Sequence, residues 1–230
     1  MNRSELSMMQ GMISILNEAS KRPILSEEEY AERLMDLQQF EEETGFVYTN
    51  SPTCKDKIGS ISVFDNVLRY DYRKCNNIDN IVEFANQREM LIYPNLIGNE
   101  VEIIYNDGIM ANVVLSNNDI NLKEVINIPY KINKQGIFAV KGVLHNQKFF
   151  VTNVVNGSIN ILNKKLEQAE NLGFNIIPYW IATINPKKLQ DSIDYVFNYA
   201  NEEELSCDGI VFRFNNNLYS SDRIVYEVMK

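Results

Sequence analysis

The sequence contains few side chains whose type and spacing would support covalent or acid–base catalysis. His145 is the only histidine among the 230 residues, and neither a Gly-x-Ser-x-Gly motif nor a Cys/His pair accompanies it. An imidazole base needs a nucleophile to deprotonate, so a hydrolytic triad is not predicted. The Gly-rich patterns that bind phosphates in many nucleotide-binding proteins are also absent. Asp191 and Asp194 stand three residues apart in a predicted helix, where we expect them to face solvent.

The cysteines do not indicate a metal site or a disulfide framework. Cys54, Cys75 and Cys207 are odd in number, lie far apart and form no Cys-x-x-Cys pair. Zinc sites and disulfide scaffolds require paired or clustered ligands. We therefore expect buried or incidental thiols and no bound metal.

The charge balance argues against a protein that holds duplex DNA through a broad basic face. The net charge is -9, whereas phosphate binding draws on many lysine and arginine contacts. A local patch is still open, because Arg69, Arg73 and Lys74 are interleaved with Tyr70 and Tyr72. Such a pattern is compatible with stacking on single-stranded bases, although a solvated strand edge is the favoured explanation.

Hydrophobic spacing and turn residues predict an α+β protein with a sheet-rich centre. A first helix is indicated by apolar residues at helical spacing, and a second begins at the N-cap Ser26 and ends near Thr44 before Gly45. The apolar residues of the two helices are Met8, Met9, Met12, Ile13, Ile15 and Leu16, then Tyr30, Leu34, Leu37 and Phe40. Glu41 to Glu43 should be surface residues. Further helices are predicted at 78–86, 162–171 and 185–199, and strands at 90–92, 101–105, 109–115, 137–144, 149–154, 174–182, 209–214 and 224–228.

Two features divide the chain. Residues 47–60 are rich in turn formers and are predicted to link a helical arm, residues 1–46, to a larger domain, residues 61–230. Within that domain, the uncharged stretch Tyr93–Gly98 is predicted to interrupt two strands, and Asp107-Gly108 to close a hairpin. No apolar run is long enough for a membrane span and no signal peptide is indicated, so a cytoplasmic location is expected.

The order of segments resembles the N-terminal part of NAD-dependent DNA ligases. The resemblance begins at Pro23–Gly59, with an acidic helix start and the linker Ser51-Pro52-Thr53, and continues through "FAVKGVL" at 138–144. It ends with "CDGIVFRFNN", in which Asp208-Gly209-Ile210-Val211 is the best single match. The resemblance implies a nucleotidyltransferase fold of antiparallel sheets with flanking helices, preceded by a helical arm.

The resemblance also implies that catalysis is lost. These ligases form a lysyl-AMP through a lysine in a Lys-x-Asp-Gly motif, and here Asn95 and Ile97 stand where the lysine and aspartate belong, with Gly98 kept. An amide nitrogen is no substitute for the amine nucleophile. No catalytic residue is therefore expected. The residues of a residual nucleotide-binding cleft would be Tyr93, Asn95, Lys141, Asp208 and Arg213.

Further departures concern NAD recognition and the other site positions. In the helical arm Tyr30 is kept, but Ala31 replaces an aspartate and no histidine precedes Leu25. Leu115 and Val143 take the places of an arginine and a glutamate, while Lys141 and Arg213 keep positive charge. No cofactor is expected, and NAD or AMP binding stays an alternative.

These substitutions lead to three functional hypotheses. The first is a non-catalytic interaction or regulatory protein of DNA replication or repair, encoded by a phage, plasmid or other mobile element, that binds a protein partner or DNA. The second is a non-covalent nucleotide or NAD sensor or sequestering protein. The third is a divergent active nucleotidyltransferase that uses another lysine.

Overall fold

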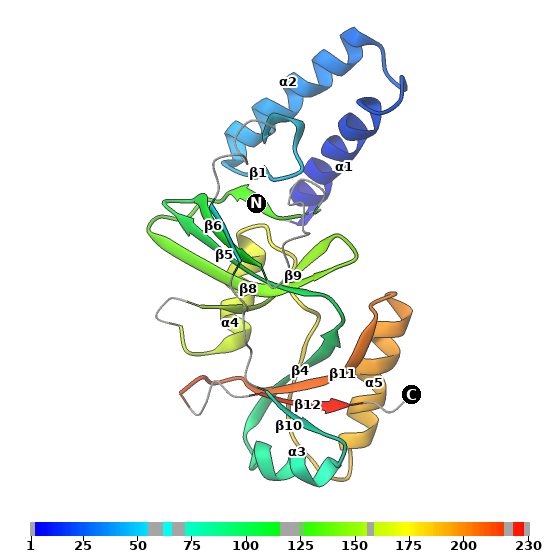
Figure 1. Cartoon of the computed structure of the whole chain (residues 1–230), viewed down its shortest axis with the longest axis vertical. Coiled ribbons are helices and arrows are strands. Elements are labelled where there is room, and N and C mark those ends of the chain that lie inside the picture. Colours follow the sequence, from blue (N-terminus) through cyan, green and yellow to red (C-terminus); the bar gives the residue numbers. More distant parts are fainter. Residues whose placement is uncertain are drawn as a thin grey trace.

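The computed structural model of the chain describes residues 3–54, 62–65, 72–115, 125, 127–155, 159–218 and 223–227. Two sheets and their flanking helices make up these residues, which confirms the predicted α+β class (Figure 1). The helices are α1 (Arg3–Ala19), α2 (Glu27–Thr44), η1 (Pro52–Cys54), α3 (Ile78–Ala85), α4 (Leu162–Asn171) and α5 (Leu189–Glu202). The strands are β1 (Val47–Tyr48), β2 (Ser62–Asp65), β3 (Arg73–Cys75), β4 (Glu89–Leu96), β5 (Asn99–Asn106), β6 (Ile109–Leu115), β7 (Pro129–Lys131), β8 (Ile137–His145), β9 (Lys148–Val154), β10 (Trp180–Thr183), β11 (Cys207–Phe214) and β12 (Arg223–Glu227).

The two sheets are predominantly antiparallel. Sheet A has the order β1-β7-β6-β5-β8-β9, with β2 beside β6, and sheet B has the order β10-β4-β11-β12-β3. Only the pairs β2–β6 and β3–β12 are parallel among the described strands. The predicted Asp107-Gly108 hairpin joins β5 to β6, and both turn residues have positive φ, +49° and +79°. This geometry is the one that an Asp-Gly turn favours.

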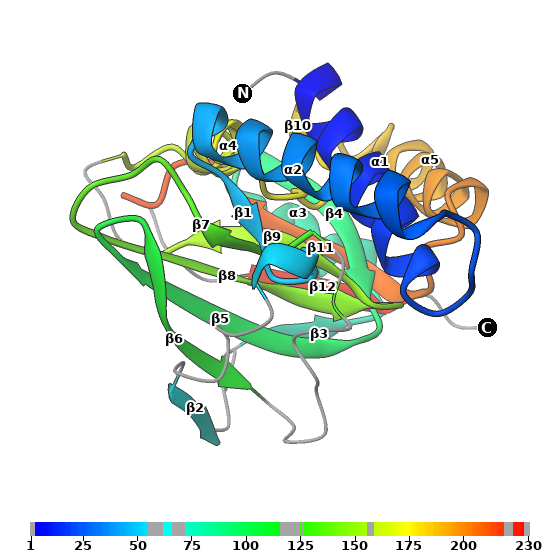
Figure 2. The same ribbon diagram turned by 90° about the horizontal axis from the view of Figure 1, so that it is seen from above.

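The two N-terminal helices lie side by side on the sheet A end of the molecule (Figure 2). Ser26 is the N-cap of α2 and Gly45 ends the helix with a left-handed backbone, as predicted, and Ser26 also forms a capping box with Glu29. Met9, Ile13 and Leu16 of α1 and Leu37 of α2 are buried in the same core as the sheet A strands. The other apolar residues predicted for the first helix differ in burial, because Met12 is partly buried whereas Met8 and Ile15 are exposed.

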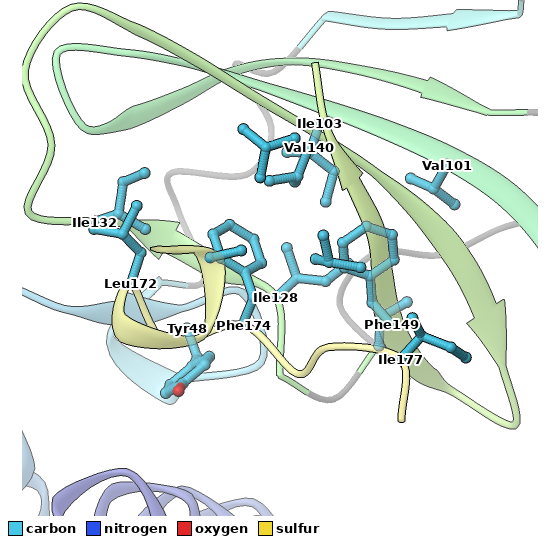
Figure 3. Packing of buried hydrophobic residues seen from close by; sticks show 14 of the residues in the cluster. Tyr48, Val101, Ile103, Ile128, Ile132, Val140, Phe149, Leu172, Phe174 and Ile177 are labelled. Carbon is cyan, nitrogen blue, oxygen red and sulfur yellow. The ribbon is translucent and has the colours of Figure 1, made fainter. Parts of the chain in front are cut away.

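The main core lies between one face of sheet A, the helix α4 and the two N-terminal helices. Figure 3 shows Phe174 at its centre, with Tyr48 and Ile128 nearby and Phe149 beside Ile177. The rings of Phe174 and Tyr105 meet edge to face with their centroids 5.7 Å apart. A second, smaller core between sheet B, α3 and α5 includes Ile92, Phe212 and Ile193. All three cysteines are buried thiols that form no disulfide.

Glu41 is not the surface residue that the acidic run Glu41 to Glu43 predicts. Its side chain is buried and accepts hydrogen bonds from Ser51 Oγ (2.7 Å) and Thr53 Oγ1 (2.6 Å). These are the residues of the Ser-Pro-Thr stretch that resembles the ligase linker. A buried carboxylate persists when it is hydrogen-bonded, and here both donors come from outside its own helix.

The segment predicted to be a linker, residues 47–60, is described as far as Cys54. Val47 and Tyr48 pair with β7, and Tyr48, Ser51 and Cys54 are buried, so this part packs into the fold. The arm and domain boundaries stay predictions. The predicted strand 174–182 is wrong for its first half, where residues 175–177 run beside Val151 of β9, and β10 is limited to Trp180–Thr183. The last predicted helix lies at Leu189–Glu202 rather than 185–199, because the turn at Asn185 to Lys188 precedes it.

Among the described residues, no helix combines the length and the apolar character that crossing a membrane requires.

Candidate nucleotide-binding site

The connection between β4 and β5 carries the chain from sheet B to sheet A. The sequence predicts an interruption over Tyr93–Gly98, and this is wrong for its first four residues, since β4 continues to Leu96. Pro94 is accommodated because β10 begins with Trp180 opposite Ile92 and does not extend beside Pro94, where β4 has a neighbour on one side only. The interruption consists of Ile97 and Gly98 alone.

Two contacts hold this short connection. The imidazole of His145 is buried, and its Nδ1 lies 2.7 Å from the Ile97 carbonyl oxygen. A carbonyl only accepts, so Nδ1 donates and Nε2 accepts from the Asn146 amide at 3.1 Å. A Cβ on Gly98 would clash with the Leu144 carbonyl oxygen of β8. Glycine is therefore needed at position 98 because the connection passes close to the backbone of β8. A left-handed conformation is not the reason, since the φ of Gly98 is not positive.

Asn95 and Asp208, two of the predicted site residues, are brought together. Cys207 pairs with Leu96 and Ile210 pairs with Pro94, so the bulged Asp208 and Gly209 stand opposite Asn95. The Asn95 amide Nδ2 donates to Asp208 Oδ1 at 2.6 Å. The Asp208 carboxylate is thus bound by the amide of Asn95, the residue at which the resemblance places an amine nucleophile.

Tyr93 and Arg213 share one face of sheet B. Arg213 pairs with Leu91, two residues before Tyr93 on the same strand, so the side chains of Arg213 and Tyr93 emerge on the same side. Both residues are buried, with 2% of Tyr93 and 7% of Arg213 exposed. The Tyr93 hydroxyl and Arg213 Nε have no hydrogen-bond partner among the described residues. Buried polar atoms are rarely left in this state unless a ligand or water satisfies them.

Lys165 of α4 adds a second buried cation near Arg213. Only 7% of the residue is exposed, and its Nζ donates to the Val154 carbonyl oxygen at 3.1 Å. Burial lowers the pKa of Lys165, and the positive charge of Arg213 lowers it further. Within the described part of the chain, neither cation forms an ion pair. Lys165 and Arg213 therefore form a buried positive pair suited to an anion.

Lys141, the remaining predicted site residue, lies on sheet A and is engaged there. It pairs in register with Glu102 of β5, and its Nζ lies 3.0 Å from Glu102 Oε2. The neighbouring Glu100 reaches across to sheet B, where Arg223 Nη2 lies 3.5 Å from Glu100 Oε1. Burial raises the pKa of Glu100, against the opposing effect of the Arg223 and Lys141 charges. Arg223 is the register partner of Arg213, so this ion pair joins the two sheets beside the buried positive pair.

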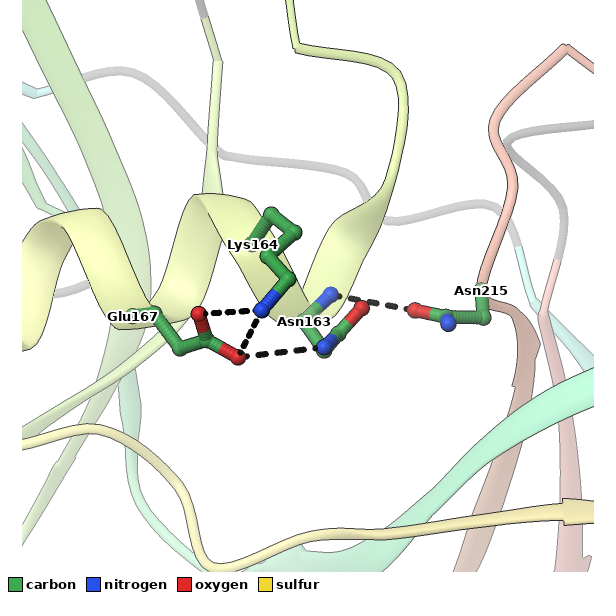
Figure 4. Close-up of polar contacts among 4 residues, drawn as sticks. All are labelled: Asn163, Lys164, Glu167 and Asn215. Carbon is green, nitrogen blue, oxygen red and sulfur yellow. Dashed lines mark hydrogen bonds and ion pairs between the residues drawn. The ribbon is translucent and has the colours of Figure 1, made fainter.

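Asn215 fixes the start of α4 from a distance. Ile161, the N-cap residue, contributes no side-chain bond, and Asn215 Oδ1 instead accepts from the Asn163 backbone N–H at 3.0 Å. Figure 4 shows this bond beside the cluster of Asn163, Lys164 and Glu167 on the first turns of the helix. The Asn215 side-chain amide also donates to Glu89 of β4. Through Asn215, sheet B sets the position of the helix that carries Lys165.

The predicted DNA patch is only partly described, because Arg69 and Tyr70 lie outside the described residues. Lys74 is paired with Glu227, and both Lys74 and Arg223 lie over the Tyr72 ring, 5.9 and 5.1 Å from its centroid. Binding of DNA through this patch stays a prediction.

Sequence reasoning missed Lys165, Glu100, Glu102 and Arg223. One signal for Lys165 was present, because it falls on the apolar stripe of α4 together with Leu162, Leu166 and Ala169. Glu100 and Glu102 alternate with buried residues of β5, which places both on one face of that strand. Nothing local to Arg223 indicates that it reaches the other sheet.

Comparisons with known proteins yielded no matching family model and no matching curated protein. Solved structures of similar fold include an RNA ligase of Naegleria gruberi, determined as a Glu-to-Ala variant with ATP and Mn, at 8% identity and a TM-score of 0.44 over 74% of this chain. A Lys-to-Met variant of the Naegleria gruberi RNA ligase with AMP and Mn matches 73% of this chain at 10% identity and a TM-score of 0.43. In both matches this chain spans 60% of the length of the ligase structure.

Proposed function

We propose that this chain is a non-catalytic relative of the ligase adenylation domains, a pseudo-ligase that acts by binding rather than by forming a covalent nucleotide adduct. The observation that carries the proposal is Asn95, which stands where the resemblance places the nucleophilic lysine and donates its amide to Asp208 at 2.6 Å. The amide nitrogen shares its lone pair with its own carbonyl, so it does not attack phosphorus.

The binding role follows from what the fold keeps. The α+β fold and the polar side chains of the site support a binding role without a nucleophile at residue 95, because function resides in such sites rather than in the fold. We infer an interaction or regulatory factor in DNA replication or repair, encoded by a phage, plasmid or other mobile element and located in the cytoplasm. This proposal rests on the resemblance to the ligases together with the loss of their nucleophile.

Adduct formation tests the proposal directly. Wild-type protein is incubated separately with ATP and with NAD, each radiolabelled in the adenylate phosphate, and the denatured protein is examined for bound label. No label is expected. An Asn95→Ala variant is the control, because it removes the amide without adding a nucleophile.

A labelled wild type would overturn the proposal and support a divergent nucleotidyltransferase that uses another lysine. Persistence of that label in Asn95→Ala would show that the adduct does not depend on Asn95. Replacing buried Lys165 and, separately, exposed Lys164 would then indicate which amine carries the adduct.

A second candidate function is non-covalent nucleotide binding, and the buried positive pair Lys165 and Arg213 favours it. Neither cation forms an ion pair in the described part of the chain, and Arg213 Nε and the Tyr93 hydroxyl lack partners. A phosphate group would satisfy these donors with charge-assisted hydrogen bonds.

Calorimetric titration with ATP, AMP, NAD, nicotinamide mononucleotide and pyrophosphate tests this second function. Binding is expected to weaken strongly in Arg213→Met and Lys165→Met and to persist in the matched control Lys164→Met. Equal affinity in all four proteins, or no heat with any ligand, would remove this function.

A further inference from the structure

An open groove with a volume of about 1170 Å³ lies between α1, the C-terminal part of α5 and the connection that leads from α4 to β10. In Figure 1 the connection is the yellow segment between these elements. Residues 173–180 line the groove, whereas none of the five predicted site residues does. The volume exceeds the roughly 300–1,000 Å³ typical of small-molecule pockets, so the groove is large enough for a segment of polypeptide.

Aromatic side chains gather at one end of the groove. Trp180 contacts Tyr195 and Tyr199 edge to face, with ring centroids 5.4 and 5.1 Å apart. Tyr195 is 58% exposed although it lines the groove, and Tyr179 and Trp180 are partly buried. Tryptophan and tyrosine provide much of the binding energy at protein interfaces, because they bury large rigid surfaces at low entropic cost.

The charges of the groove are predominantly acidic. Glu170 and Glu203 line it and are exposed, and Lys148 is the only cation among its described lining residues. Burial raises the pKa of Tyr179, and the negative charges of Glu167 and Glu170 raise it further against the opposing charge of Lys164. With two carboxylates and one lysine, the charge of the groove favours a cationic segment over a nucleic acid.

The groove also leads to a strand edge. Trp180 begins β10, the outermost strand of sheet B, which pairs only with β4 among the described strands. Ile181, the next residue of β10, is 41% exposed. An unpaired edge beside an aromatic groove is the arrangement in which a sheet accepts an extended peptide as an additional strand.

We propose that this aromatic groove binds an extended segment of a partner protein, which pairs with the β10 edge. The segment would place an aromatic or aliphatic side chain against Trp180 and Tyr195 and a lysine or arginine beside Glu203. The inference goes beyond the proposed function, since it names the surface and the chemical class of the partner. It does not require the absence of an adduct.

Trp180 is the only tryptophan of the chain, so its fluorescence reports on the groove directly. The full-length protein is titrated with a short synthetic peptide in which lysine alternates with valine and other aliphatic residues. The peptide contains no tyrosine or tryptophan. A peptide of the same pattern with glutamate in place of lysine and a single-stranded oligonucleotide are titrated in parallel. A saturable change in Trp180 emission is expected with the lysine peptide alone.

Two variants locate the contact. Glu203→Lys should weaken binding about three- to fivefold, the effect of one exposed charge pair. Its matched control Glu202→Lys, an exposed neighbour that does not line the groove, should bind as the wild type does. Tyr195→Ala should weaken binding more than Glu203→Lys, because it removes an aromatic anchor.

Several results would overturn the inference: no fluorescence change with the lysine peptide, equal binding of the glutamate peptide, a response to the oligonucleotide instead, or equal losses in Glu203→Lys and Glu202→Lys. Hydrogen exchange checks the strand pairing, since amides of Trp180–Thr183 that are not bonded to β4 should be protected by the bound peptide. The adduct assay is independent of all these measurements, so failure of this inference is distinguishable from failure of the proposed function.

Discussion

Replacing Lys165 by methionine should stabilise the protein. Lys165 is 7% exposed, has no ion pair in the described part of the chain and lies near the charge of Arg213, so burying its ammonium group is only partly compensated. Methionine keeps most of the apolar stem and removes the charge. It leaves the Val154 carbonyl without its lysine donor, which costs about 1 kcal/mol. We expect a net gain of about 1–3 kcal/mol in the free energy of unfolding.

The pH dependence of this gain has a definite sign. The native pKa of Lys165 lies below its ordinary value of 10.5, so between the two values the unfolded chain binds more protons than the folded chain. Wild-type stability contributed by this group therefore rises with pH in that interval. The advantage of Lys165→Met should be complete below the native pKa and should shrink as the pH approaches 10.5.

Thermal and urea unfolding measure the effect, with exposed Lys164→Met as the matched control. For a chain of this size each kcal/mol corresponds to about 2–4 °C in Tm. Saturating pyrophosphate should stabilise the wild type and reduce the difference from Lys165→Met, since the anion compensates the same charge. A loss of more than about 1 kcal/mol in Lys165→Met, with Lys164→Met unchanged, would refute the reasoning, because it would show that Lys165 is stabilised by its surroundings.

Three further substitutions test structural contacts, each by chemical denaturation of the full chain. Ser51→Ala removes one of the two hydroxyl donors to buried Glu41 and should cost about 1.5–3 kcal/mol, the range for a hydrogen bond to a charged group. Asn215→Ala removes the side chain that caps α4 and should cost about 1–2 kcal/mol, with a matching loss of helical circular dichroism. Gly98→Ala places a Cβ against the Leu144 carbonyl oxygen and should cost about 2–4 kcal/mol; an unchanged midpoint would show that the connection does not approach β8 this closely.

Local sequence signals predicted much of the fold. Ser26, Glu29 and Gly45 bounded α2 correctly, and Asp107-Gly108 located the β5–β6 hairpin, because caps and tight turns depend on residues close in sequence. Pro94 was misleading for a physical reason. Proline argues against a central strand, but β10 does not extend beside it, and the position behaves as an edge.

The candidate site was only partly predictable, because its contacts join residues that are distant in sequence. The pair Asn95 and Asp208 was named from the resemblance, and the structure brings the two side chains together across a bulge that no local pattern indicates. Lys165 was overlooked, since a single lysine on an apolar helical stripe is normally expected to extend its ammonium group into solvent. Its burial depends on Val154 and on the neighbouring sheet, which helix periodicity does not describe.

The residues that match the ligase pattern divide into two classes according to their partners. Asp208 is bonded to Asn95 and Asn215 caps α4, so stability alone accounts for a polar side chain at each position. Arg213 is different, because it is buried with Nε unpaired and lies near a second buried cation. A buried cation of this kind costs stability unless a partner compensates its charge. An anion bound at Arg213 and Lys165 would offset that cost. Substitutions of these two residues, and not of Asn95, therefore distinguish a nucleotide-binding protein from one that binds no nucleotide.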